Sequence, residues 1–374
     1  MRTIRPAAET PSRTRAWGPS RGPHVTPASL RYDWLMVALC AWFQAGAYLD
    51  AWAHVHLTEF ESFFTPWHGV LYSGFFAVAV LTATPLLRRR PPGRAWNEAL
   101  PAGYDLSLVG VLVFLLGGVL DMIWHTLYGI EADVEALLSP SHLVLAVGST
   151  LILTGPLRSA WGRAQAGSWR ATMPMMLSAS FLLSSISFWT LYMHPISRPW
   201  AALGNRPTVS GLPVVAPDPV GLKDGTLGAL YIAHGMGVGS ILLQSAVLTG
   251  LVLLLVRRWG GALPAGGFTI ALTLNALMLG FARDQLVLVP FIAAGGIAVD
   301  ALVRWLRADT STGRLRALAI LVPAAYFTCY FVGVAVTKGL WWSVHLWTGS
   351  IVLAGLTGWL TSYLVAPPAA PARR

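Results

Sequence analysis

Long apolar stretches recur along almost the whole chain, and each is about as long as the 20 or so helical residues that cross a bilayer. We place ten of them, with approximate ends, at 34–56, 66–87, 107–128, 140–162, 173–194, 227–256, 266–282, 287–305, 317–337 and 341–366. Charged residues make up 11% of the 374 residues, against about 25% in a soluble domain. A soluble enzyme, a coiled coil and a disordered protein are therefore excluded. We expect an all-α, polytopic integral membrane bundle of about ten transmembrane helices.

The placement of the basic residues predicts how this bundle is oriented. If the N-terminus is inside, 21 of the 26 Lys and Arg residues fall on the inner side. We therefore expect a multi-pass protein of the cell (plasma) membrane with both termini in the cytoplasm and the lipid bilayer as its main partner. The net charge of +10 is then an orientation signal, and no nucleic-acid partner is expected.

The composition also predicts how the chain is divided. Residues 1–30 are rich in Arg, Pro, Ser and Thr and read as a disordered, basic, cytoplasmic tail. We expect a metal-binding half over 31–165, a C-terminal membrane bundle over 166–366 and a short tail over 367–374. Cys40 and Cys329 lie inside apolar stretches, so neither a disulfide framework nor a Cys-based metal site is expected.

Histidine and acidic residues gather at one side of the predicted membrane. Every histidine except His24 falls at or near the outer end of a helix. Ionisable groups at membrane depth are costly and point to function. We therefore expect the functional site at the outer face.

One pattern occurs twice along the chain as a tandem repeat. Asp50 and His54 are followed by the sequence Thr-Pro-Trp-His, which ends at His68. Asp121 and His125 come 71 residues after the first pair and are followed by Ser-Pro-Ser-His, which ends at His142. Thr65 and Ser139 are typical N-cap residues, and a proline follows each at the first helical position. The pattern predicts two helical hairpins in the same orientation.

Each hairpin brings two imidazoles and one carboxylate to a common point. Asp and His four residues apart share one helix face, and the second His lies in the first turn of the returning helix. Two His and one carboxylate can bind copper, iron or zinc with open positions left for water or substrate. A hydrogen-bonded pair at a helix end, or a simple cap, would explain a single copy, but capping needs neither the Asp nor the second His. The predicted metal ligands are Asp50, His54, His68, Asp121, His125 and His142.

Three further histidines and one charged pair give weaker signals. His194 with His234 could be a degenerate third hairpin, and His345 a remnant of another, but both lack the Asp. Arg283 and Asp284 close a short loop, which suggests an ion pair or a helix anchor.

The two motifs resemble the C subunit of particulate methane and ammonia monooxygenases over residues of about 45–160. In that family the unit occurs twice in tandem and binds copper. Asp50, His54 and His68 match one ligand set, and Asp121, His125 and His142 match the other, where the family commonly has Asn in the acidic position. The resemblance implies copper, further membrane subunits and O2-dependent oxidation of a small apolar substrate that arrives from the bilayer. The C-terminal half has no counterpart in that match.

Our preferred hypothesis is an integral membrane protein that binds copper, with iron or zinc as other metals, and that acts as a monooxygenase or a subunit of one. A partner subunit or a second copy of the chain would complete such an enzyme. Two alternatives are a membrane metal transporter or copper-handling protein, and a haem protein with His pairs as axial ligands.

Overall fold

The computed structural model describes residues 27–57, 64–89, 96–129, 134–163, 167–209, 212–213 and 226–367. Its long helices are α1 (Leu30–His56), α2 (Pro66–Arg89), α3 (Asp105–Tyr128), α7 (Trp169–Trp189), α8 (Thr226–Trp259), α10 (Val289–Leu306), α11 (Thr312–Lys338) and α12 (Val344–Val365). Shorter ones are α4 (Glu135–Leu138), α5 (Pro140–Leu153), α6 (Gly155–Trp161) and α9 (Gly267–Ala282). The 3-10 turns are η1 (Trp96–Ala99), η2 (Leu191–Met193), η3 (Leu203–Asn205), η4 (Gly260–Ala262), η5 (Leu286–Leu288) and η6 (Ala308–Thr310), and β1 (Thr208–Val209) pairs with β2 (Leu212–Pro213).

The chain forms a helical membrane bundle. Seven helices of the described part are long and apolar enough to cross a membrane, or eight if α5 and α6 are one bent span. Helices occupy all ten predicted places, but α9 is short and α1 carries Asp33, Gln44 and Asp50. The expected count of about ten transmembrane helices is therefore not confirmed.

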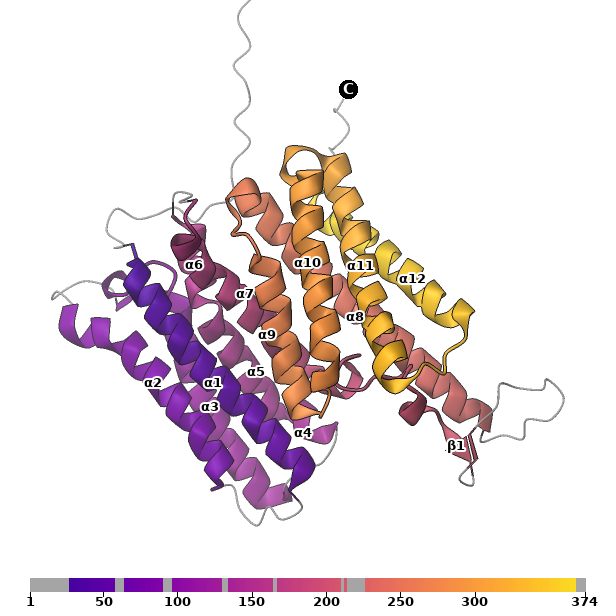
Figure 1. The fold of residues 1–374 in the computed structure, drawn as a ribbon. Helices are drawn as coiled ribbons and strands as arrows, with labels where there is room; N and C mark the ends of the chain where they lie inside the picture. The colour runs from indigo at the N-terminus through magenta and orange to yellow at the C-terminus, as the bar shows by residue number, and fades with distance from the viewer. Residues whose placement is uncertain are drawn as a thin grey trace, which may run out of the picture.

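The helices pack in two groups that meet at α7. In Figure 1, α1, α2, α3 and α5 lie together, and α8 to α12 lie side by side on the other side of α7. Buried aromatic side chains of Phe43, Phe75 and Phe114 join α1, α2 and α3 in the first group. The division into halves at 165 and 166 stays a prediction. Most of the predicted tails lie outside the described residues, but α1 already begins at Leu30, where the Ser29 hydroxyl accepts a hydrogen bond from Tyr32 N.

Glycines let the helices of each hairpin approach closely. A Cβ on Gly46 of α1 would lie 2.7 Å from Leu71 Cα of α2. In the second hairpin, a Cβ on Gly148 of α5 would lie 2.6 Å from Phe114 N of α3. Small residues permit such backbone contact between membrane helices, so the ends of each pair are brought to a short, defined distance.

The helix predicted over 140–162 is broken in the structure. α5 and α6 meet at an angle of 41° beside Pro156, which lacks an N–H and would clash with the preceding turn of a straight helix. Ser178 of α7 repairs the break, since its hydroxyl donates to Leu153 O and accepts from Leu157 N. The guanidinium of Arg158 also donates to Leu151 O. Side chains of α7 and of α6 itself thus satisfy the backbone groups that the break exposes.

Candidate metal centre

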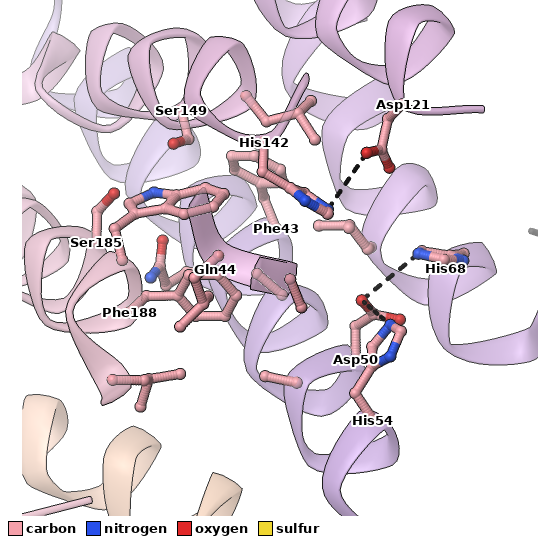
Figure 2. A pocket seen from close by; sticks show the side chains of 18 of the residues that line it. Phe43, Gln44, Asp50, His54, His68, Asp121, His142, Ser149, Ser185 and Phe188 are labelled. Atoms are coloured by element: carbon pink, nitrogen blue, oxygen red, sulfur yellow. Dashed lines mark ion pairs between the residues drawn. The ribbon is translucent and has the colours of Figure 1, made fainter. Parts of the chain in front are cut away.

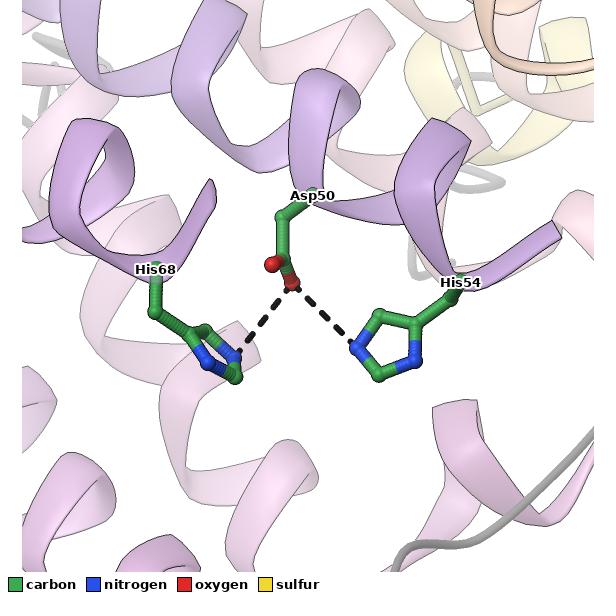
Figure 3. Close-up of side chains that lie close together, drawn as sticks. All are labelled: Asp50, His54 and His68. Carbon is green, nitrogen blue, oxygen red and sulfur yellow. Dashed lines mark ion pairs between the residues drawn. The ribbon is translucent and has the colours of Figure 1, made fainter. Parts of the chain in front are cut away.

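The first group of predicted ligands converges at the end of α1. Asp50 and His54 are one turn apart on α1, and His68 lies in the first turn of α2, where Thr65 Oγ1 accepts a hydrogen bond from His68 N. One carboxylate oxygen, Asp50 Oδ2, lies 3.6 Å from His54 Nε2 and 3.5 Å from His68 Nε2 (Figure 3). The other oxygen, Asp50 Oδ1, is buried and has no hydrogen-bond partner in the described part of the chain.

The second group has the same composition and is more deeply buried. Asp121 and His125 lie on α3, and His142 lies in the first turn of α5. His125 Nε2 is 3.5 Å from Asp121 Oδ2, and His142 Nε2 is 3.3 Å from Asp121 Oδ1. The hydroxyl of Ser141 donates to Asp121 Oδ1 over 2.9 Å. The Asp121 side chain is only 3% exposed, so its charge is stable only beside positive charge or hydrogen-bond donors.

Polar groups behind the second group fix how its imidazoles are turned. His125 Nδ1 lies 3.2 Å from the carbonyl oxygen of Gly129. A carbonyl can only accept, so Nδ1 carries the proton and a neutral His125 has its lone pair on Nε2. His142 Nδ1 is 2.6 Å from Ser139 Oγ. The expected cap by the Ser139 side chain is wrong, because this hydroxyl pairs with the imidazole and not with the backbone. Such partners on the outer ring nitrogen are typical of metal-binding histidines.

The distances between ligand atoms fit a metal ion better than a hydrogen bond. N–H···O bonds span about 2.7–3.2 Å, whereas two atoms bound to one tetrahedral ion at about 2.0–2.1 Å lie about 3.3–3.4 Å apart. In each group, one atom per residue can be chosen so that all three lie within 4.8 Å. Asp50 Oδ1, which is buried and has no hydrogen-bond partner among the described residues, is open to a cation.

His56 shows how a hydrogen-bonded His–Asp pair looks in the same molecule. His56 Nε2 lies 2.6 Å from Asp284 Oδ2, and His56 Nδ1 lies 2.8 Å from Trp52 O. Both ring nitrogens thus have acceptors, as in an imidazolium ion pair. Asp284 of the short loop thus pairs with His56 of α1, and an ion pair between Arg283 and Asp284 stays a prediction. The four distances between Asp oxygens and His Nε2 atoms in the two ligand groups are 3.3–3.6 Å, which is longer than this hydrogen bond.

One cavity of about 590 Å³ opens onto both groups of ligands (Figure 2). α1, α2, α3, α5 and α7 wall it, and Arg283 from the end of α9 also contributes. Aromatic side chains of Phe43, Phe114, Phe188 and Trp189 also line it. All six predicted ligands therefore line one cavity.

A second hollow, of about 600 Å³, lies between α2 and α3. Its lining is almost entirely apolar and consists of Phe64, Thr65, Pro66, His68, Gly69, Tyr72, Phe76, Leu115, Gly118, Val119 and Met122. His68 and Tyr72 line both this groove and the cavity. These two side chains therefore belong to the wall that the apolar groove and the cavity share.

The other histidines lie apart from both groups. His194 is buried, and its Nδ1 accepts a hydrogen bond from Ile196 N over 3.1 Å. Burial lowers the pKa of His194 to about 3. His234 stacks on Trp341, and His345 is exposed in the first turn of α12. Among the described residues, none of the three joins a cluster that could hold a metal.

The sequence alone did not predict the rest of the cavity wall. Gln44, Ser149, Ser185 and Trp189 reach the cavity from α1, α5 and α7. Trp189 is the tryptophan of the wall, although Trp52 and Trp124 are nearer in sequence to the motif histidines. Gln44 and Ser185 are polar residues within apolar helices, and this is the sequence signal that could have identified them as cavity residues.

The chain matches no protein family model, no curated protein and no solved structure. The two groups of predicted ligands and the cavity that they line are therefore the features that indicate the function of this protein.

Proposed function

We propose that this membrane protein binds two copper ions, one at Asp50, His54 and His68 and one at Asp121, His125 and His142. The observation that carries the proposal is the spacing of 3.3–3.6 Å between the carboxylate of each Asp and the Nε2 atoms of its two histidines, through one oxygen of Asp50 and through both oxygens of Asp121. Imidazole and carboxylate donors accept copper, iron and zinc, and Cu(II) binds most strongly to a given site of this kind. The resemblance to particulate monooxygenases also favours copper.

We further propose that the bound metal serves the oxidation of a small apolar molecule. Copper would supply the ability to activate O2. Ser139 and Gly129 O orient two of the imidazoles. The apolar groove between α2 and α3 offers a route from lipid to His68. This groove suits an apolar substrate that is dissolved in the bilayer.

The two other functions fit the geometry less well. In each group the carboxylate lies between two imidazoles, which leaves no room for a haem plane between them. A metal transporter would need ligands that continue across the membrane. The residues of α1 on the far side of the cavity include the buried apolar side chains of Met36, Val37 and Cys40. A transport role would appear as metal flux in sealed vesicles.

Metal content of the purified protein in lipid nanodiscs tests the proposal. We expect two copper ions in the wild type, one in His54→Ala, one in His125→Ala and none in the double variant, which should remain folded. His56→Ala and His345→Ala are matched controls and should keep both ions, because these imidazoles lie outside the two groups. A double variant with full copper occupancy would refute the assignment, and zinc or iron at the same ratio would refute copper.

A further inference from the structure

The cavity extends beyond the two groups of predicted metal ligands. Its inner end carries two polar side chains, Gln44 and Ser185, that are not among these ligands. Gln44 lies six residues before Asp50 on α1, which is about 9 Å along the helix axis. Ser185 of α7 lines the same region. Figure 2 shows Gln44 and Ser185 on the side of the cavity away from His68.

Both side chains are buried and have unused hydrogen-bonding capacity. Gln44 is 3% exposed and Ser185 is 2% exposed. Neither makes a side-chain hydrogen bond within the described part of the chain, whereas the adjacent Ser184 hydroxyl donates to Tyr48. Because both residues line the cavity, a bound molecule with a hydrogen-bond donor or acceptor could pair with the amide of Gln44 and the hydroxyl of Ser185.

The walls around this inner end are uncharged. The ionisable side chains that line the cavity are those of the two ligand groups, Tyr72 and Arg283. Around Gln44 the lining includes Phe43, Phe188 and Trp189, and Ser149 of α5 adds a hydroxyl that is already bonded to Ala146 O. An uncharged polar group with an apolar body suits such a wall.

We propose that the cavity binds an amphiphilic molecule of the medium-chain alcohol class, with its oxygen held by Gln44 and Ser185. Its apolar chain lies against Phe43, Phe188 and Trp189 and ends beside the ligand groups of Asp50 and Asp121. The volume of about 590 Å³ lies in the range of small-molecule sites and far exceeds what a gas molecule needs. As a substrate class for the metal centre, this inference rests on the proposed function, but the binding itself does not require the metal.

Competition photolabelling of the protein in nanodiscs tests the proposal. The probe is an octanol that carries a diazirine on its alkyl chain, and unlabelled octanol or octane is the competitor. We expect the probe to label peptides of α1, α5 and α7, and octanol to compete at least about five-fold better than octane, as for one neutral hydrogen bond. Gln44→Leu and Ser185→Ala should each abolish this preference.

Two matched controls show that the effect is local. Gln244→Leu removes a buried glutamine of α8 that donates to Thr190 Oγ1 outside the cavity. Ser187→Ala removes a buried serine of α7 that does not line the cavity. Both variants should keep the preference for octanol.

Copper content is measured on the same samples, so that failure of the alcohol site can be told from failure of the copper sites. A variant that binds as much copper as the wild type is also folded. If octane and octanol compete equally in copper-loaded wild type, the alcohol site is refuted and the copper sites are not. The same holds if Gln44→Leu and Ser185→Ala both keep the preference for octanol. Octanol preference in a protein that binds no copper would support the polar site and refute the copper sites.

Discussion

Single side chains decide whether the two groups can hold a metal. A neutral imidazole binds a metal through one nitrogen, and the partner of the other nitrogen fixes which one is available. In the second group, Gly129 O and Ser139 Oγ supply these partners to His125 and His142. Metal binding by the second group would therefore also depend on Gly129 and Ser139, which are not among the predicted ligands.

Ser139→Ala should weaken copper binding at the second group only. The change removes the 2.6 Å contact to His142 Nδ1 and lets the imidazole rotate. Loss of such an outer partner costs about 10–100-fold in metal affinity. Copper titration of His54→Ala, in which only the second group is expected to bind, with and without Ser139→Ala measures this change. The exposed Ser73→Ala is the control, since its hydroxyl contacts only Val70 O, and equal affinities with and without Ser139→Ala would contradict the proposed role.

His194 should make the protein less stable at acidic pH. Burial lowers its pKa to about 3, and its Nδ1 accepts a hydrogen bond from Ile196 N, so it is neutral in the folded state. In the unfolded chain a histidine takes up a proton below about pH 6.5, so the stability that the neutral form supplies is lost as pH falls from 6.5 towards 3. Between pH 7 and pH 5 the free energy of unfolding should fall by about 2 kcal/mol through this histidine.

His194→Asn tests this linkage, because asparagine keeps an acceptor near the Ile196 N–H but does not titrate. Thermal unfolding in nanodiscs at pH 7 and pH 5 should show a smaller acid shift in the variant than in the wild type. His345→Asn is the control, since His345 is exposed and should leave the shift unchanged. Identical acid shifts in wild type and His194→Asn would count against the buried neutral form.

At the scale of the elements, close contact between two helices sets the distances within each group of ligands. The second His of each group lies on a different helix from the Asp, so the ligand spacing depends on how near the helices pack. Gly46 and Gly74 in the first hairpin, and Gly148 in the second, remove the side chains that would hold the backbones apart.

Gly46→Val should therefore lose copper at the first group and keep it at the second. The new Cβ would meet Leu71 Cα at 2.7 Å and force α1 and α2 apart near Asp50 and His68. Overpacking of this kind costs about 1–3 kcal/mol of stability. Copper content and thermal unfolding measure both effects. Gly69→Ala, where no atom lies within 4 Å of the added Cβ, should keep both ions, and full occupancy in Gly46→Val would show that the ligand spacing does not depend on this contact.

At the scale of the whole molecule, the bundle has two chemically different ends. Asp50, Asp121 and the cavity lie at one end, whereas Arg304, Arg307, Arg314 and Arg316 gather at the turn between α10 and α11 at the other. The positive-inside rule predicts that the Arg-rich turn is cytoplasmic and that the ligand groups lie near the outer face.

Cysteine labelling of intact cells tests this orientation. Gly204→Cys lies in η3, close in sequence to the end of α7 that walls the cavity, and Gly313→Cys lies in the first turn of α11. Both glycines have open space around the position of a Cβ, so the two variants are a matched pair. In a background without Cys40 and Cys329, a membrane-impermeant thiol reagent should label Gly204→Cys and spare Gly313→Cys. The reverse pattern would invert the predicted topology.

Much of the fold and the six ligands could be predicted from the sequence because both leave local signals. Hydropathy is a property of each segment, so helices occur at all ten predicted places. An Asp and a His one turn apart share a helix face in any helix, and Thr65-Pro66 marks the start of the next helix wherever it packs. Pro156 is a local signal for the α5–α6 break, but the Ser178 hydroxyl that satisfies the freed backbone groups and the pairing of Ser139 with the His142 ring were not predicted, because both depend on where another side chain lies.

The sequence by itself determined that the chain is a helical membrane protein and that two sets of Asp, His and His residues stand at helix ends. Only the tertiary structure decided that both sets face one cavity, that Trp189 walls it and that Gln44 and Ser185 point into it. The physical reason is that a cavity is what five packed helices leave unfilled. Its shape and lining depend on how closely α1, α2, α3, α5 and α7 approach one another, and no single helix encodes that distance.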